Sequence, residues 1–139
     1  MNDRTKFYFK GRTLKGEITA GYLEIKRGDD GVEYFYIRNP ETKNVDEVAP
    51  ETVGRCTGCK DRYGKLIFEG DVVRQYSPME DAERLCAVEW SNEANSFLCR
   101  YLDGRGNPCG WGDPNSTYFD GSLCTLVGNI HDGIGDYVL

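Results

Sequence analysis

Hydrophobic and polar residues alternate along most of the chain in short segments separated by turn residues, a pattern that predicts a mainly β protein. The segments GYLEI at 21–25 and VEYFYI at 32–37 flank RGDDG, so we expect them to pair as a hairpin whose glycines supply the positive φ of the turn. CAVEW at 86–90 and SFLCRY at 96–101 flank SNEAN and predict a second hairpin. Further strands are expected at 6–10, 66–68, 70–76 and 122–130.

Two stretches interrupt this pattern. The polar segment SPMEDAERL at 77–85 predicts an excursion with at most one helical turn. The segment 103–122 has no regular pattern and is longer than the ~15 residues beyond which loops are uncommon and often functional. It carries Trp111, Tyr118 and Phe119 among glycines and prolines. These rings are expected either to fold back onto the domain or to form a subunit contact, because aromatic residues concentrate in interface hot spots.

The spacing of three cysteines predicts that they pack in a core. Alternation places Cys86 on the same face as Val88, and Cys99 on the same face as Phe97. Cys124 lies in the similar apolar segment SLCTLV. Free cysteine behaves in such positions as a small hydrophobic residue.

Composition fits one cytoplasmic globular domain. A chain of 139 residues with 39% hydrophobic residues can bury a core, and no apolar run approaches the ~20 residues of a membrane span. The start MNDRTKFYFKGR has no apolar secretory core, so we expect the protein in the cytoplasm with its six cysteines reduced.

Charge is distributed unevenly within a net charge of −6. Residues 1–27 carry seven Lys/Arg and three Asp/Glu, a balance of +4, which leaves −10 for residues 28–139. We therefore expect nucleic acid to bind no tighter than about 10⁻⁵ M at physiological salt, and we interpret the basic start as an edge strand protected by its cations. The alternative is a single-strand site that combines cations with stacking rings. Its cations would be Arg4, Lys6, Lys10, Arg12 and Lys15, beside Phe7, Tyr8 and Phe9.

Cys56 and Cys59 form a Cys-x-x-Cys pair, which raises the question of a metal or redox site. A structural zinc site needs four ligands, yet there is no second such pair and His131 is far along the chain. A redox pair needs a helix N-terminus after the first cysteine, whereas KDRYGKLIFEGD reads as turn, strand and turn. We expect neither metal nor cofactor, and we keep a metal or redox activity of this pair as the least favoured hypothesis.

Residues 48–73 resemble the YopX family of phage and prophage proteins, whose shared pattern looks like ETxGxxTGxKDxxGxxIxEGDxV. GVEYFYIRN before this stretch and LVGNIHD after it extend the resemblance over most of the chain. Cys59 stands where the family usually has an aliphatic residue, which argues that the cysteine pair is incidental. The matching residues are Glu51, Thr52, Gly54, Thr57, Gly58, Lys60, Asp61, Gly64, Ile67, Glu69, Gly70, Asp71 and Val72.

The motif residues have ordinary structural explanations. Asp61 can accept hydrogen bonds from nearby backbone N–H groups, and Gly64 can take positive φ in the turn KDRYG. Glu69, Gly70 and Asp71 are expected to form a tight polar corner before the next strand. The carboxylates of Asp61, Glu69 and Asp71 are alternative candidates for binding a divalent cation or for acid–base chemistry, but turn carboxylates are usually solvated.

The sequence thus predicts a single mainly β, β-rich α+β domain over residues 1–139. N-terminal antiparallel strands through about residue 54 would pack on a small SH3-like barrel formed from about residue 65 to residue 139. The resemblance implies a phage or prophage origin and supplies no catalytic activity. We expect a non-enzymatic structural or protein-interaction module that forms a homo-oligomer and binds a phage or host protein. The alternatives are the nucleic-acid-binding barrel and the metal or redox protein described above.

Overall fold

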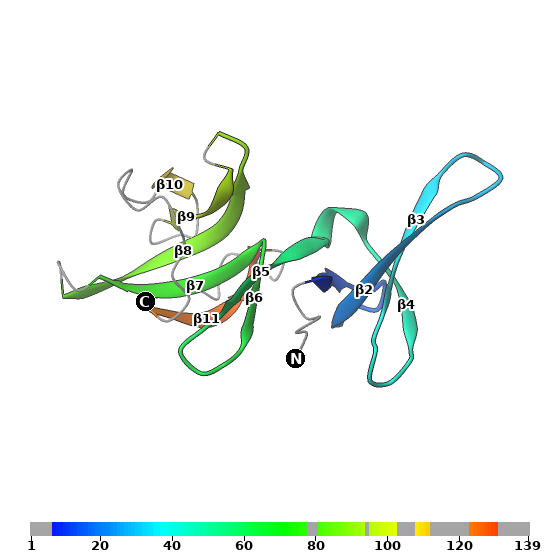
Figure 1. Ribbon diagram of the computed structural model, residues 1–139. Coiled ribbons are helices and arrows are strands. Elements are labelled where there is room, and N and C mark those ends of the chain that lie inside the picture. Colours follow the sequence, from blue (N-terminus) through cyan, green and yellow to red (C-terminus); the bar gives the residue numbers. More distant parts are fainter. Residues whose placement is uncertain (1–6, 78–80, 94, 103–107, 112–122, 131–139) are drawn as a thin grey trace. The chain divides into compact units, whose positions relative to one another are not determined.

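The computed structural model describes residues 7–77, 81–93, 95–102, 108–111 and 123–130, and these are almost entirely antiparallel β structure (Figure 1). The chain divides into two compact units, Met1–Cys56 and Thr57–Leu139, called here the N-terminal and C-terminal units. In the described parts, no helix is long and apolar enough to cross a bilayer. The N-terminal unit contains β1 (Phe9–Arg12), β2 (Ile18–Arg27), β3 (Glu33–Arg38), β4 (Val45–Val48), a 3₁₀ turn η2 (Pro50–Thr52) and the start of β5 (Gly54–Lys60). The C-terminal unit contains the rest of β5, then β6 (Leu66–Phe68), β7 (Asp71–Ser77), β8 (Ala82–Ser91), β9 (Ser96–Leu102), β10 (Pro108–Trp111) and β11 (Cys124–Asn129).

In the N-terminal unit the strands follow the order β4-β3-β2-β1-β5. The strand expected at 6–10 begins only at Phe9, and it pairs with β2 on one side and with Gly54 and Arg55 of β5 on the other. The prediction of a basic edge strand is therefore wrong, because β1 lies inside the sheet. Local alternation identifies a strand, but it does not say which neighbours the strand acquires.

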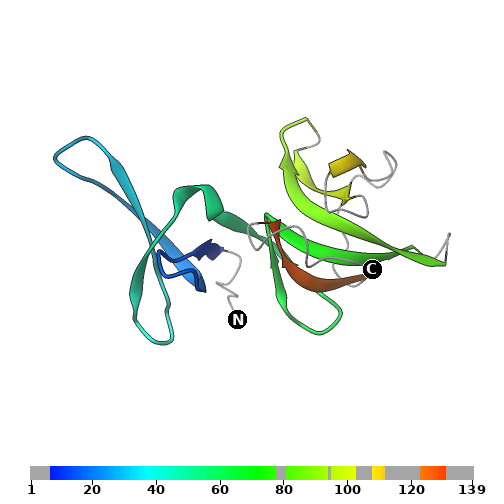
Figure 2. The same cartoon turned by 180° about the vertical axis from the view of Figure 1, so that it is seen from behind.

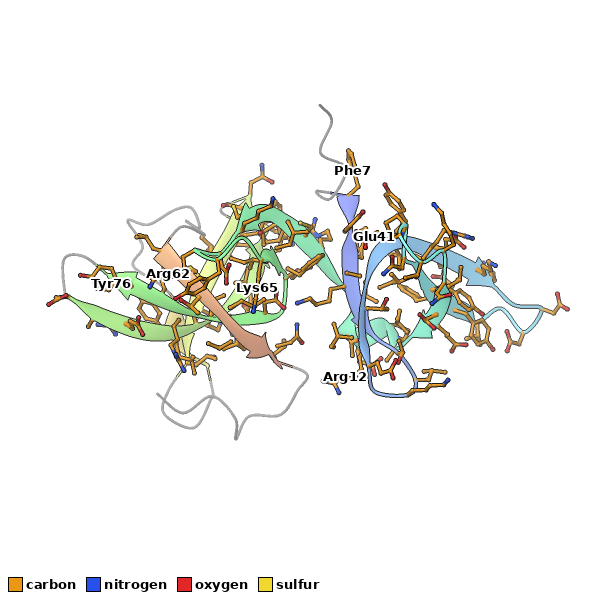
Figure 3. All side chains as sticks on the ribbon, turned by 90° about the horizontal axis from the view of Figure 1, so that it is seen from below. Phe7, Arg12, Glu41, Arg62, Lys65 and Tyr76 are labelled. Atoms are coloured by element: carbon orange, nitrogen blue, oxygen red, sulfur yellow. The ribbon has the colours of Figure 1, made fainter. Side chains whose placement is uncertain are left out.

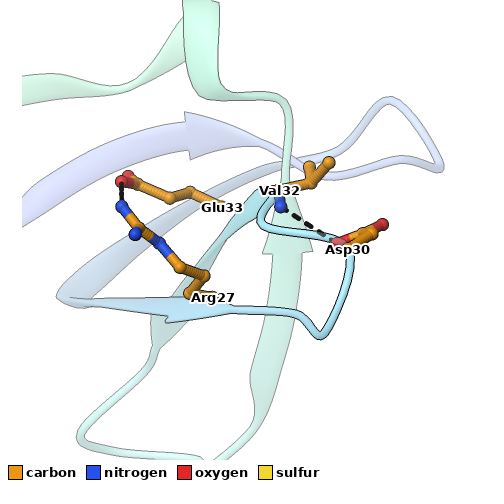
Figure 4. Close-up of polar contacts among 4 residues, drawn as sticks. All are labelled: Arg27, Asp30, Val32 and Glu33. Carbon is orange, nitrogen blue, oxygen red and sulfur yellow. Dashed lines mark hydrogen bonds and ion pairs between the residues drawn. The ribbon is translucent and has the colours of Figure 1, made fainter.

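The predicted hairpin of residues 21–37 is confirmed as β2 and β3, which extend beyond the rest of their unit in Figure 1 and Figure 2. Its turn is closed by backbone hydrogen bonds from Gly28 N–H to the Val32 carbonyl at 2.8 Å and from Gly31 N–H to the Gly28 carbonyl at 3.0 Å. Gly31 has a φ of 80°, as such a turn requires. Figure 4 shows Asp30 accepting from the Val32 N–H at 2.9 Å and an ion pair between Arg27 and Glu33 at 3.1 Å.

The N-terminal unit has a small core. Ile37 and Val48 are fully buried, and a Cβ added at Gly11 would lie 3.1 Å from Ile37 Cδ1 and 3.2 Å from Val48 Cβ. One end of β4 returns to β1 through a bridge between Thr13 and Val48 and a hydrogen bond from the Ala49 N–H to the Arg12 carbonyl. The sheet thus curls around these few side chains, with the glycine leaving room for them.

Gly21 lies close to the backbone of the neighbouring strand β3. A Cβ at this position would lie 2.1 Å from the carbonyl oxygen of Arg38 and 3.2 Å from Cα of Asn39. Both atoms belong to the backbone where β3 ends, so no side-chain rotation could make room. The sheet therefore requires glycine here for the space it leaves.

In the C-terminal unit, β10-β9-β8-β7-β11 form a five-stranded sheet, and β6 pairs with β5. The predicted hairpin of 86–101 is confirmed, with Val88 opposite Cys99 and Trp90 opposite Phe97. The expected excursion at 77–85 is mostly wrong, because β8 begins at Ala82 and pairs with Ser77 of β7. The segment 103–122 likewise contains a strand, β10, which sequence periodicity did not predict.

The core of the C-terminal unit is built from small and β-branched side chains. Cys124 on β11 and Cys99 on β9 belong to the same buried cluster, so the inner face of the sheet curls around it. Its members are Ile67, Val73, Cys86, Val88, Cys99 and Cys124. A smaller cluster of Val72 and Leu85 is buried separately, packed against Leu102 and Val127. Mainly β structure is thus confirmed, whereas an SH3-like barrel is not, since neither described sheet is closed.

Candidate functional site

The basic N-terminal stretch is divided between two faces of its sheet. Phe9 pairs with Gly21 and Lys10 with Ala20, so Lys10 and Arg12 share one face while Phe9 points to the other. Figure 3 shows Phe7 and Arg12 at opposite ends of β1. The structure therefore keeps only part of the predicted basic and aromatic cluster together. Lys15 lies in the exposed turn after β1, and Arg4 and Lys6 lie outside the described residues.

Four tyrosines lie on the same face of the N-terminal unit as Lys10 and Arg12, and we call this surface the tyrosine face. The register of β2 with β3 continues the alternation, because Glu24 lies opposite Tyr36 and Lys26 opposite Tyr34. Tyr8, just before β1, contacts Tyr22 edge to face at 5.3 Å between ring centroids. The tyrosine face comprises Tyr8, Lys10, Arg12, Ile18, Ala20, Tyr22, Glu24, Lys26, Tyr34, Tyr36, Arg38, Val45 and Glu47.

Charged and aromatic groups are interleaved on the tyrosine face. The Lys26 ammonium lies over the ring of Tyr36 at 5.3 Å from its centroid, a cation–π arrangement. Arg38 Nε donates to Glu24 Oε1 at 2.8 Å, and this hydrogen bond lowers the pKa of Glu24 below its ordinary value. Among the described residues, the four cations of this face exceed its two carboxylates, Glu24 and Glu47, and the one carboxylate beside it, Asp30, which accepts from the Tyr34 hydroxyl at 3.2 Å. The surface is thus locally positive within an acidic chain.

This surface was not predicted from the sequence, although part of its signal is visible there. VEYFYIR alternates between Tyr34, Tyr36 and Arg38 on one side and Phe35 and Ile37 on the other. Pairing with β2 and β1 then adds the remaining members from residues far away in the chain. That pairing could not be read from alternation alone.

In the family motif, threonine hydroxyls join neighbouring chain segments. Thr57 Oγ1 donates to the Ile67 carbonyl of β6 at 2.8 Å and accepts from the Cys59 N–H at 3.1 Å. Thr52 Oγ1 donates to the Ala49 carbonyl at 2.6 Å and accepts from the Arg12 N–H at 2.9 Å. Each hydroxyl uses both its donor and its acceptor capacity on backbone groups.

Asp61 organises the turn that follows β5. Its Oδ1 accepts from the N–H groups of Tyr63 and Lys65, both at 2.9 Å, and its Oδ2 accepts from the Leu126 N–H of β11 at 3.0 Å. Burial raises the pKa of Asp61, but the three amide hydrogen bonds and the charge of Lys65 outweigh it and hold the pKa below its ordinary value. Gly64 has a φ of 84°, as expected for this turn. The carboxylate thus ties the turn to the sheet.

Asp71 has a similar position at the corner before β7. It is fully buried, accepts from the Phe68 N–H at 2.8 Å, and accepts from Asn129 Nδ2 at 3.0 Å. Gly70, with a φ of 91°, exchanges backbone hydrogen bonds with Val88 and Ile130. Glu69 is partly exposed beside it, and Gly58, with a φ of 80°, and the exposed Lys60 lie in β5. The two motif aspartates accept hydrogen bonds from backbone N–H groups and from a side-chain amide. They therefore have a structural role that requires no cation.

The Cys-x-x-Cys pair does not form a shared site in either unit. Cys56 is buried in the N-terminal unit, where its N–H donates to the Tyr8 carbonyl, while Cys59 packs against the core cluster of the C-terminal unit. In that cluster, hydrogen bonding with Cys124 and Cys86 together with burial raises the pKa of Cys99, so this thiol stays protonated. Among the described residues, no three His, Cys, Asp or Glu side chains are arranged to hold a metal ion.

We predict that the purified protein contains no stoichiometric zinc and that Cys56→Ser with Cys59→Ser retains the fold, because the two side chains belong to separate packing environments. The double substitution should cost about 1–3 kcal/mol at the buried Cys56 and less at the half-buried Cys59, since serine puts a hydroxyl in place of each thiol. Elemental analysis and thermal unfolding check this. About one zinc per chain, lost together with folding in the variant, would contradict it.

The predicted interaction loop is described only in part. Trp111 ends β10, an edge strand of the five-stranded sheet, and its backbone lies opposite Arg100. Tyr118 and Phe119 lie outside the described residues. The interaction role of these three aromatic residues therefore stays a prediction.

Comparison with known proteins assigns the chain to a family. The chain has no match among curated protein sequences. One family model, described as YopX protein, matches residues 5–133, which includes the motif of residues 51–72 and nearly all the described strands of both units. The resemblance drawn from the motif is therefore confirmed, and the chain belongs to the YopX protein family.

Proposed function

We propose that this protein is a non-enzymatic interaction module of phage or prophage origin that self-associates in the cytoplasm, mainly through apolar side chains of its N-terminal unit and also through sheet edges that include β10. The observation that carries this proposal is the imbalance between buried and exposed apolar side chains in that unit. Its described residues contain three buried hydrophobic side chains, Ile37, Val48 and Cys56. A unit of this size with so small a core gains stability when a partner covers its apolar surface.

Large apolar side chains are exposed on the same unit. Ile25, near the free end of the β2–β3 hairpin, is 51% exposed, and Leu14 in the turn after β1 is 68% exposed. Ile18, Val32 and Val45 are exposed as well. Covering such residues with a second copy of the chain would remove apolar area from water and favour a homo-oligomer.

The sheet edges supply a second route to self-association. Strand β1 cannot pair with another copy of the chain, because it lies between β2 and β5. The edges of the described sheets include β4 and β10, and β4 carries the exposed Val45. An edge strand can pair with the same strand of another copy, which satisfies backbone groups that otherwise face water.

We expect light scattering to give a mass that is a multiple of 15.7 kDa and depends on protein concentration. Ile25→Glu should reduce the fraction of oligomer at least about tenfold, because a charge would be buried in the contact. Thr42→Glu, which adds the same charge at an exposed turn of this unit, is the matched control and should leave the mass unchanged. Trp111→Ala tests whether the edge strand β10 contributes to the contact between copies.

A monomeric mass at every concentration would exclude the proposal. If an oligomer forms and Trp111→Ala leaves its mass unchanged, only the role of β10 is lost. If Ile25→Glu and Thr42→Glu weaken the oligomer equally, the contact depends on net charge and the hairpin is not its centre.

Nucleic-acid binding by the basic and aromatic N-terminus is the second candidate function. The specific observation in its favour is the tyrosine face, on which Lys10 and Arg12 meet tyrosines and cations from β2 and β3. Binding of nucleic acid to this face does not require self-association.

A further inference from the structure

We propose that the tyrosine face of the N-terminal unit binds single-stranded nucleic acid. The surface combines four tyrosine rings with Lys10, Arg12, Lys26 and Arg38 on one face of three adjacent strands. Surfaces that hold single strands without reading sequence use this combination of rings for the bases and cations for the phosphates. The inference stands independently of the proposed oligomer.

The tyrosines supply π surfaces at fixed positions. Tyr34 and Tyr36 lie on the same face of β3, and Tyr22 of β2 forms an edge-to-face pair with Tyr8, just before β1. All four are half-buried, so each ring is anchored by its surroundings while part of it remains open to solvent. Anchored rings lose little conformational entropy when a base stacks on them.

The cations lie among the rings. Lys26 is exposed and its ammonium lies 5.3 Å from the centroid of Tyr36, so one pair of side chains offers both a stacking surface and a phosphate contact. Arg38 is also exposed but shares its guanidinium with Glu24 at 2.8 Å. Charge complementarity therefore points to a polyanion, and the rings point to a polyanion with exposed bases.

A single strand fits this surface better than a duplex. The bases of a duplex are stacked on each other and unavailable to tyrosine rings, so a duplex could use only the cations. With a net charge of −6 on the chain, those cations alone give little long-range attraction. Stacking must then contribute much of the affinity, which favours unpaired bases.

The test uses the full chain and a fluorescein-labelled thymidine oligonucleotide of ~15 nucleotides, a length typical of such sites. Fluorescence anisotropy should show saturable binding with Kd on the order of 10⁻⁵ M at about 50 mM salt. Affinity should fall about twentyfold when the salt is raised to about 200 mM, because about three phosphate contacts release their counterions. A duplex of the same length should bind at least about fivefold more weakly.

Adjacent residues of β2 provide matched variants. Lys26→Gln removes a cation from the tyrosine face, whereas Arg27→Gln removes one from the opposite face next to it. We expect Lys26→Gln to weaken binding about threefold and to reduce its salt dependence, and Arg27→Gln to change it less than about twofold. Tyr36→Ala should weaken binding about fivefold or more, while Tyr36→Phe, which keeps the ring, should bind as the unchanged chain does. Lys26 and Arg27 are both exposed, so Lys26→Gln and Arg27→Gln leave folding intact.

Absence of saturable binding at low salt would overturn the inference, and so would equal losses in Lys26→Gln and Arg27→Gln. Duplex binding as tight as single-strand binding, or equal competition by polyglutamate, would show that only charge is recognised and would also overturn it. Light scattering of Lys26→Gln separates this surface from self-association. An unchanged mass together with weaker oligonucleotide binding supports the inference whether or not the chain forms an oligomer.

Discussion

Replacing Asp61 by Asn is expected to destabilise the C-terminal unit by about 3 kcal/mol, because the aspartate uses both of its oxygens as acceptors. An asparagine can keep the two hydrogen bonds made by Oδ1, but its NH₂ group would then face the Leu126 N–H, leaving two donors opposed. The site is 5% exposed, so water cannot replace the lost acceptor. Urea unfolding followed by tryptophan fluorescence measures the loss, since Trp90 and Trp111 both belong to this unit.

The difference in free energy of unfolding between the unchanged chain and Asp61→Asn should depend on pH. The folded state lowers the pKa of Asp61, so its stabilising contribution is fully present above the pKa of the unfolded chain and disappears as the pH falls through the folded value. The gap between the unchanged chain and Asp61→Asn should therefore narrow in acid. Asp81→Asn is the matched control, because this exposed carboxylate accepts one hydrogen bond, from Tyr76, that an asparagine can also accept. A cost below about 0.5 kcal/mol is expected for it. Equal effects of the two substitutions would show that Asp61 is only a solvated turn residue.

Gly21→Ala is expected to cost the N-terminal unit about 3 kcal/mol or more and to disrupt its β2–β3 hairpin. The new methyl group would lie 2.1 Å from the Arg38 carbonyl oxygen, which belongs to the backbone, so β3 would have to move away from β2. Amide hydrogen exchange should therefore accelerate across β2 and β3. Tryptophan fluorescence should change little, because both tryptophans lie in the C-terminal unit.

Gly16→Ala is the control for this substitution. A Cβ at Gly16 meets no atom within 4 Å, although its φ of 88° carries the usual penalty for a side chain. That penalty is about 1 kcal/mol. If Gly21→Ala costs no more than Gly16→Ala, the sheet tolerates a wider strand separation and the close approach has no structural importance.

Features that depend on neighbouring residues were predictable from the sequence. The β2–β3 and β8–β9 hairpins follow from alternation on both sides of a short polar turn, and the burial of Cys86 and Cys99 follows from the same alternation. The positive φ of Gly64 follows from the turn chemistry around Asp61. In each case the determining residues lie close together in the sequence.

Features that depend on distant residues were not predictable. The hydrogen bond from the Leu126 N–H to Asp61 joins residues 65 positions apart, and no local sequence pattern predicts it. The internal position of β1 depends on β5, and the tyrosine face depends on the register of three strands. A barrel was expected because the polar corner at 69–71 is similar to the corner of small SH3-like barrels, yet neither that corner nor alternation specifies whether the sheet closes.

The buried cysteines of the unmodified chain can report how often each unit opens locally. A buried thiol reacts with an alkylating reagent only while its surroundings are transiently open, so the reaction rate reports the free energy of that opening. Cys56 reports on the N-terminal unit, and the fully buried Cys86 and Cys124 report on the C-terminal unit. Mass spectrometry of each labelled peptide would thus resolve the two openings without an engineered label. Faster labelling at Cys56 would mean that the thinly packed N-terminal unit opens by itself, whereas equal rates would mean that both units open in one cooperative event.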